Sequence, residues 1–203
     1  MHLYIRKTEG SVQKIIGALE QENELFEVAS KEYSAASRSA SRWPKDAFSA
    51  RFKKAALRVD SMGGESPSAT GALAVVQWHF VRESSYGTLN ALSGTLLQIA
   101  RQGISSIHGE PPVNCPDGRT IGTQALRDVI WHGRNHAMHF EHPPRKTTRP
   151  SLVKLERDFP VRFSGITSDR RNHAWQIVKL LEWTSYAVYS SDMMSLLPTV
   201  PAG

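Results

Sequence analysis

The sequence is poor in cysteine and has no long apolar run. Cys115 is the only cysteine among 203 residues, so the chain can form neither an intrachain disulfide nor a zinc site built from several thiolates. The most apolar stretch, 72–81, is short and is interrupted by Gln77 and His79. The first ten residues also lack the apolar core of a signal peptide. These absences predict a cytoplasmic protein that does not enter a membrane.

The rest of the composition is that of a folded domain with an excess of positive charge. Hydrophobic residues make up 40% and charged residues 22%, which are ordinary proportions for a globular protein. The chain carries 25 Lys and Arg against 19 Asp and Glu, a formal net charge of +6. Clustered Lys and Arg attract phosphate, so this excess favours an anionic partner. The length predicts one domain over residues 1–203.

Apolar residues recur at spacings of three and four along most of the chain, which is the period of an amphipathic helix. We therefore predict an all-α fold, an up-down bundle of four or five helices. Loops are expected where Gly, Pro and basic residues gather, at about 61–69, 109–119 and 143–168. Phe159, Val161 and Phe163 alternate with Arg162, so a short strand or hairpin is expected near 152–164. The predicted helices cover 11–34, 46–59, 68–107, 120–141 and 168–197.

The predicted helix over 120–141 has an unusual concentration of histidine. Half of the eight histidines fall within eleven residues of it. At about 100° per residue the polar residues form one stripe, and the apolar residues cover the opposite side. We expect one face to pack into the core and the other to carry chemistry. The stripe contains Asp128, His132, Asn135, His139 and His142, and the apolar side contains Leu126, Val129, Ile130, Gly133, Ala137 and Phe140.

Three residues of this helix combine groups that suit phosphodiester cleavage. Asn135 and His139 are four residues apart and therefore neighbours, and Arg134 lies at the edge of the stripe. Imidazole moves protons near neutral pH, guanidinium is a forked donor that matches phosphate oxygens, and an amide can orient either group. The set predicts a site that acts on a phosphate ester.

The string Arg-Asn-His-Ala-Met-His over 134–139 resembles the signature of the HEPN (higher eukaryotes and prokaryotes nucleotide-binding) superfamily, which is Arg, a polar residue, three spacers and His. Members of that family are small helical bundles with the motif on a late helix. Many are dimers in which two motif helices face each other and form one composite ribonuclease site, and many are toxins or antiviral defence proteins. The strict resemblance covers these six residues.

The resemblance implies a role for each matching residue. Arg134 would bind or stabilise the scissile phosphate, Asn135 would orient or contact it, and His139 would transfer protons. The 2′-hydroxyl of the RNA would attack, which leaves a 2′,3′-cyclic phosphate without a metal or another cofactor. The expected protein is a metal-independent endoribonuclease, a homodimeric toxin or phage-defence effector with RNA as substrate and a possible antitoxin as partner.

The signature occurs a second time, seven residues upstream, as Arg-Asp-Val-Ile-Trp-His over 127–132. We favour the copy at 134–139 because Arg-Asn is the commoner pairing in the family. His136 departs from the family pattern, since a small or apolar residue often fills this spacer position. Arg127, Asp128, His132 and His136 are expected to support the site, and Arg145, Lys146 and Arg149 are expected to hold the RNA backbone.

Two other interpretations remain open. His132, His136 and His139 are spaced four and three apart and could bind a divalent metal in a metal-dependent hydrolase, with His79 or His173 as a more distant ligand. Alternatively, the histidines serve only to bond neighbouring helices, and the chain is a non-catalytic nucleic-acid-binding or protein-binding module of HEPN type.

Overall fold

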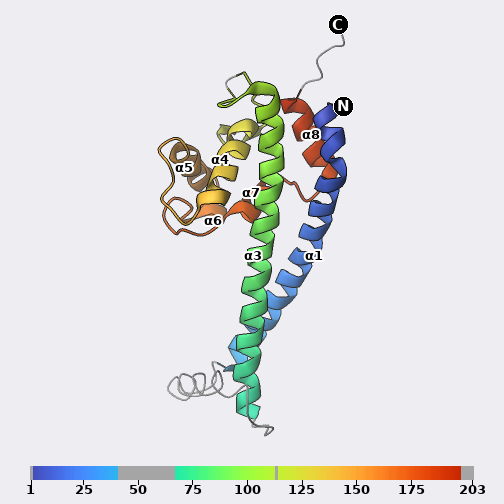
Figure 1. Cartoon of the computed structure of the whole chain (residues 1–203). Coiled ribbons are helices and arrows are strands. Elements are labelled where there is room, and N and C mark those ends of the chain that lie inside the picture. Colours follow the sequence, from blue (N-terminus) through green and yellow to red (C-terminus); the bar gives the residue numbers. More distant parts are fainter. Residues whose placement is uncertain (1, 41–66, 113, 198–203) are drawn as a thin grey trace. The chain divides into compact units, whose positions relative to one another are not determined.

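The computed structural model describes residues 2–40, 67–112 and 114–197, and these residues are predominantly helical (Figure 1). Two long helices, α1 (Leu3–Ala40) and α3 (Pro67–His108), confirm the helices expected over 11–34 and 68–107, although α1 extends further at both ends. The helix expected over 46–59 lies outside the described residues. The remaining elements are β1 (Thr120–Ile121), β2 (Gln124–Ala125), α4 (Leu126–His139), α5 (Arg149–Asp158), α6 (Pro160–Phe163), α7 (Ala174–Leu180) and α8 (Tyr186–Leu196).

The chain divides into two compact units, 21–88 and a larger unit that combines 1–20 with 89–203. Within the described part of the smaller unit, rings of α1 contact rings of α3. Phe26 and Tyr86 lie 5.6 Å apart between ring centroids, and Tyr33 lies 5.5 Å from His79. No described helix has the length and apolarity needed to span a bilayer.

The larger unit holds the core that positions α4. Helix α4 contacts α5, α7 and the small sheet. Its Val129 and Ile130 are fully buried, as are Ile177 and Val178 of α7. Burial of such aliphatic side chains is the main favourable contribution to packing, at about 1.5–3 kcal/mol for each residue. The core of the larger unit also contains Val12, Leu19, Leu89, Leu96, Leu97, Ile104, Leu152, Leu155, Phe163, Trp175 and Trp183.

The strand or hairpin expected near 152–164 is wrong, because this range contains α5 and α6. Side chains two residues apart on a strand share one face, but Val161 is fully exposed while Phe163 is fully buried. Leu152 and Leu155 are buried three residues apart, which is the helical spacing. The apparent alternation of apolar residues here is part of a helical pattern. The two helices also interrupt the loop expected over 143–168.

A hairpin does occur, but earlier in the chain, within the helix expected over 120–141. Strands β1 and β2 are antiparallel, with Thr120 opposite Ala125 and Ile121 opposite Gln124. The two turn residues begin with Gly122, whose φ of 59° lies in the left-handed region that glycine adopts without strain. The helix therefore begins only at Leu126.

The helix expected over 168–197 is divided into α7 and α8. The break lies at 181–185, where Glu182 has a φ of 59°, a value that no α-helix contains. Trp183 on the C-terminal side of this residue is fully buried. The turn thus places a large ring in the core.

Candidate functional site

Helix α4 presents the apolar face that the sequence predicts, except for Phe140, which lies beyond the end of the helix and is half-buried. Leu126, Val129, Ile130, Gly133 and Ala137 are all buried. Gly133 allows a close approach to α7, because a Cβ atom there would lie 3.2 Å from two carbons of Ile177. The opposite face of α4 is consequently the one available for chemistry.

The polar stripe is confirmed in its central part. Asp128, His132 and Asn135 are half-buried, and His139 is exposed. Helix α4 ends at His139, so His142 does not belong to the helical stripe, contrary to expectation. The chain leaves the helix before Pro143 and Pro144, because proline cannot continue it.

A hollow of about 260 Å³ opens beside the C-terminal end of α4. It brings together two of the three residues expected to be catalytic, Asn135 and His139, with one of the expected RNA-binding residues, Arg145. Lys146 and Arg149 are exposed but do not line the hollow. Its lining consists of Asn135, His136, His139, His142, Pro143, Pro144, Arg145 and Thr148.

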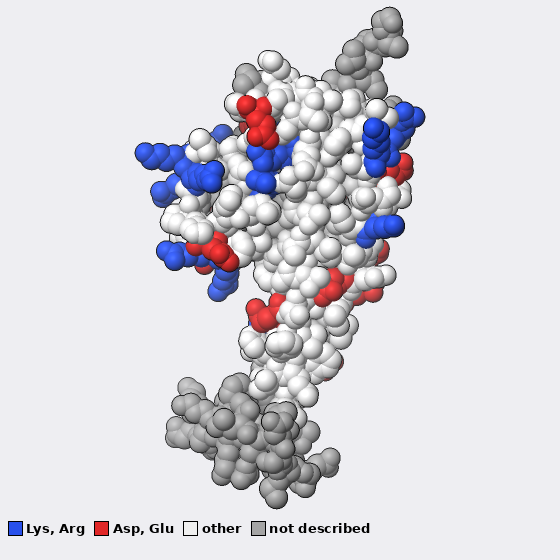
Figure 2. All heavy atoms as spheres, viewed as in Figure 1, with Lys and Arg blue, Asp and Glu red and all other residues white. Residues whose placement is uncertain are grey.

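Basic side chains lie around this part of the larger unit. Figure 2 shows Lys and Arg gathered over α5 and the segments next to it. Arg145, Lys146 and Arg149 are among the exposed cations there. Their charge raises the local concentration of phosphate-bearing ligands.

Arg134 faces away from the hollow. Its Nε donates a hydrogen bond to the Gln98 amide oxygen on α3, and its Nη1 donates to Asn135 Oδ1 at 3.4 Å. Burial is the main cause that lowers the pKa of the Arg134 guanidinium, and the nearby charge of Arg101 lowers it further. Arg134 stays protonated, since its ordinary pKa is far above neutral pH.

The upstream copy of the signature is held by structural contacts. Arg127 forms ion pairs of 3.0 Å with both Asp117 and Asp128, and its Nη1 donates to the Cys115 carbonyl at 2.6 Å. Burial lowers the pKa of His132, although the Asp128 charge raises it in part. Because the Arg127 guanidinium is already engaged on three sides, Arg134 remains the better candidate for binding a phosphate.

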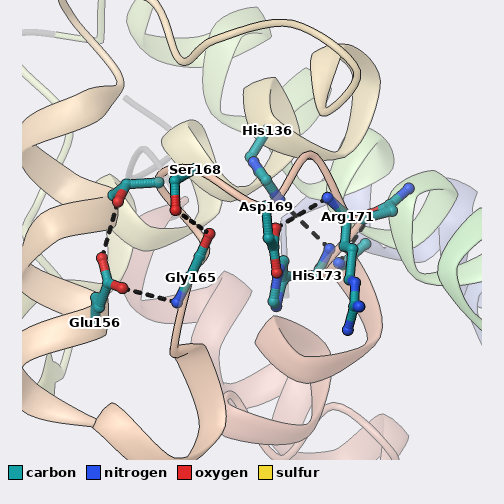
Figure 3. A network of polar contacts seen from close by, with 10 residues as sticks. His136, Glu156, Gly165, Ser168, Asp169, Arg171 and His173 are labelled. Carbon is teal, nitrogen blue, oxygen red and sulfur yellow. Dashed lines mark hydrogen bonds and ion pairs between the residues drawn. The ribbon is translucent and has the colours of Figure 1, made fainter.

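His136 is buried, with 5% of its surface exposed, and belongs to a polar network with the segment before α7 (Figure 3). Its Nε2 accepts a hydrogen bond from the His173 backbone N–H at 3.4 Å. The His173 Nε2 lies 3.1 Å from an Asp169 carboxylate oxygen. Burial, followed by the nearness of His173, lowers the pKa of His136 to about 4, so this imidazole is neutral at pH 7. It joins α4 to the 169–173 segment.

The arrangement does not support a three-histidine metal site. His173 does lie beside His136, with ring centroids 5.7 Å apart, as the metal interpretation would require of a distant ligand. However, His136 points into the core while His139 is exposed. Among the described residues, no group of three or more His, Cys, Asp or Glu side chains is placed to hold a metal ion.

Two residues that the sequence pattern does not single out, Gln98 and Arg101, contact α4 from α3. Gln98 accepts the bond from Arg134, and the Arg101 guanidinium lies 4.3 Å from the centroid of the Trp131 ring. The sequence contains only a weak signal that these two residues contact another helix. They are polar, three residues apart, and next to Leu97 and Ala100 in the buried face of α3.

The chain matches no protein-family model, no curated protein and no solved structure.

Proposed function

We propose that this chain is a metal-independent endoribonuclease of HEPN type, and that Arg134, Asn135 and His139 of α4 form its site. The observation that carries the proposal is the position of His139. It is exposed at the end of α4, one helical turn from Asn135, on a hollow that Arg145 also lines. An accessible imidazole beside a cation can reach an RNA phosphodiester and move its protons.

The proposed reaction is an internal transesterification. The 2′-oxygen of the ribose forms a bond to phosphorus while the bond from phosphorus to the 5′-oxygen of the next nucleotide breaks. The products are a 2′,3′-cyclic phosphate and a 5′-hydroxyl end. One proton leaves the 2′-hydroxyl and one reaches the departing 5′-oxygen, and His139 transfers at least one of them. Arg134 stabilises the charge that develops on the phosphorane oxygens.

The proposed site is composite. Arg134 and His139 lie about 140° apart around α4, at 100° per residue, so one chain does not bring both to one phosphate. A homodimer in which two α4 helices face each other supplies the missing group from the second copy. In each composite site the guanidinium then comes from Arg134 of one chain and the imidazole from His139 of the other. A toxin or phage-defence role with an antitoxin partner fits such an enzyme and belongs to this proposal.

The test is an RNA cleavage assay in EDTA with wild type, His139→Ala and His142→Ala. We expect cleavage by wild type to survive chelation and to yield 2′,3′-cyclic phosphate ends. His139→Ala should lower the rate by at least about 100-fold, the usual contribution of a proton-transferring group. His142→Ala is the matched control, because His142 is exposed on the same hollow but lies outside the signature.

The outcomes separate the competing functions. Cleavage that stops in EDTA would indicate a metal-dependent hydrolase. Equal loss in both histidine variants would assign the chemistry to the hollow in general rather than to the signature.

A non-catalytic RNA-binding module is the second candidate. The observation that favours it is the engagement of Arg134 by Gln98 and Asn135, which holds the guanidinium in place without substrate. RNA binding without cleavage under either condition would support this alternative.

A further inference from the structure

Two of the contacts between helices α3 and α4 involve arginine side chains and lie about one turn apart. Arg134 bonds to Gln98, and Arg101 stacks over Trp131. Gln98 and Arg101 are three residues apart on α3, and Trp131 and Arg134 are three apart on α4. At 1.5 Å of rise per residue, the two contacts are about 4.5 Å apart along the helices. The Arg101 and Arg134 side chains thus belong to adjacent contacts, and the charge of Arg101 is near enough to lower the pKa of Arg134.

The positive charge at this seam is only partly balanced. Among the described residues Arg101 forms one ion pair, 3.2 Å from Glu110, and the Glu110 side chain is 58% exposed. An exposed carboxylate attracts a cation weakly, because water screens it. The Arg134 partners, Gln98 and Asn135, are neutral amides. Two guanidinium groups thus share one solvated carboxylate.

Both guanidinium groups also retain unused donors. The Nε of Arg101 is buried and has no hydrogen-bond partner in the described part of the chain. In the same residues, Arg134 forms its bonds through Nε and Nη1, which leaves Nη2 available. The Trp131 ring attracts the Arg101 guanidinium, whose central carbon lies 4.3 Å from the ring centroid, but it accepts none of the N–H hydrogen bonds that an oxygen acceptor could take.

We propose that Arg101 and Arg134 together form a phosphate-binding site at the α3/α4 seam, and that its ligand is a backbone phosphodiester of single-stranded RNA. Forked donors on two neighbouring guanidiniums match the oxygens of a phosphate, and one such anion neutralises the excess charge. Arg101 is a binding residue in this site, and Trp131 and Gln98 orient the two cations. The inference rests on the proposed function only in taking RNA as the ligand.

The experiment measures binding in a His139→Ala background, so that the RNA stays intact. The probe is a fluorescein-labelled single-stranded RNA 12-mer, and its anisotropy is followed from about 50 to 200 mM KCl. We expect Arg101→Gln to weaken binding by about five- to tenfold. The slope of log affinity against log salt should become shallower by about 0.7, the value for one phosphate contact to a single strand. Arg101→Lys should keep the salt slope but lose part of the affinity, because lysine lacks the fork.

Arg82→Gln is the matched control. Arg82 also lies on α3, stacks 4.4 Å from the centroid of the Tyr33 ring and pairs with Glu83 at 2.6 Å. It should leave RNA affinity and salt slope unchanged. Circular dichroism and thermal unfolding of each variant confirm that the comparison is made between folded proteins.

A second measurement distinguishes RNA from free phosphate. Thermal unfolding in inorganic phosphate is compared with chloride at equal ionic strength for wild type and Arg101→Gln. Loss of phosphate-dependent stabilisation with unchanged RNA affinity would show an oxyanion site and overturn RNA as its ligand. Equal RNA affinity and equal stabilisation in both proteins would overturn the site itself. Absence of RNA cleavage by wild type, with binding that still depends on Arg101, would reject the proposed catalysis and support this site.

Discussion

Arg134 and His139, the two ends of the signature, point to different sides of α4. The Arg134 guanidinium is bonded to Gln98 of α3, whereas His139 lies on the hollow that Arg145 lines. Five residues at 100° each place the two side chains about 140° apart. A phosphate that contacts His139 therefore cannot also contact Arg134 of the same chain. The Arg134 guanidinium of a second copy of α4 can take its place.

This geometry predicts complementation between two inactive variants. Arg134→Gln and His139→Ala should each lower RNA cleavage at least about 100-fold. A mixture of the two chains, after exchange of subunits, should recover part of the activity. In a heterodimer one composite site contains the intact Arg134 of one chain and the intact His139 of the other.

The control is a chain that carries both substitutions, mixed with wild type under the same conditions. It should not raise the activity above that of wild type alone. A heterodimer of wild type with the double variant contains no composite site in which Arg134 and His139 are both intact. A mixture of the single variants that stays inactive despite proven dimer exchange would place Arg134 and His139 in one chain's site.

Local periodicity predicted the elements whose burial pattern repeats over many turns. Helix α3 was expected over 68–107 and extends over Pro67–His108, because its apolar residues keep three-four spacing throughout. The buried side of α4, from Leu126 to Ala137, was correct for the same reason. His139 was expected on the polar face opposite the core, and it is exposed. These features depend only on residues that are neighbours along the chain.

Features that depend on distant contacts could not be predicted. His136 lies between the buried and the polar face, and only its contact with His173 shows that it belongs to the core. Thr123 donates its backbone N–H and its hydroxyl to Asp158, 35 residues later, and these bonds help to hold the hairpin that replaces the first turn expected of α4. Arg101 meets Trp131 from another helix. Helical period carries no information about such partners.

Substitution of the two signature arginines should separate structure from function. Arg127→Gln removes two ion pairs and a bond to the Cys115 carbonyl, so we expect a loss of about 1–2 kcal/mol in the free energy of unfolding. Its cleavage rate per folded molecule should remain near that of wild type. Arg134→Gln should lower the cleavage rate while the free energy of unfolding stays near that of wild type. Urea unfolding and the RNA assay measure the two effects, and loss of cleavage only in Arg127→Gln would assign the site to the upstream copy.

His136 should make the protein less stable in mild acid. Its folded-state pKa is lowered from 6.5 to about 4, so the unfolded chain binds the proton more readily between these values. The stability linked to neutral His136 is therefore complete above pH 6.5 and is lost as the pH falls towards 4. Between pH 7.5 and pH 5 the free energy of unfolding should fall by about 2 kcal/mol from this group. Urea denaturation at both pH values measures the change.

His136→Gln should remove most of that pH dependence, although the variant itself is less stable at pH 7.5. His142→Gln is the control, because His142 is exposed and its replacement should leave the wild-type dependence intact. Burial also lowers the pKa of His132, which adds a dependence of the same sign to all three proteins. A His136→Gln variant that loses stability in acid as steeply as wild type would contradict the assignment.

Asp192 should contribute more to stability than an exposed ion-pair partner of the same charge. Its carboxylate is 7% exposed and accepts two bonds from Arg119, at 2.8 and 3.0 Å, and one from the Trp183 indole N–H at 2.8 Å. Asp192→Ala leaves the buried indole N–H without an acceptor, so we expect a loss of about 3 kcal/mol in the free energy of unfolding. Glu83→Ala breaks the exposed pair with Arg82 and should cost less than about 1 kcal/mol. Urea denaturation at pH 7 compares the two variants. Similar losses in both would mean that Asp192 does not anchor Arg119, and with it the segment that leads into β1 and α4.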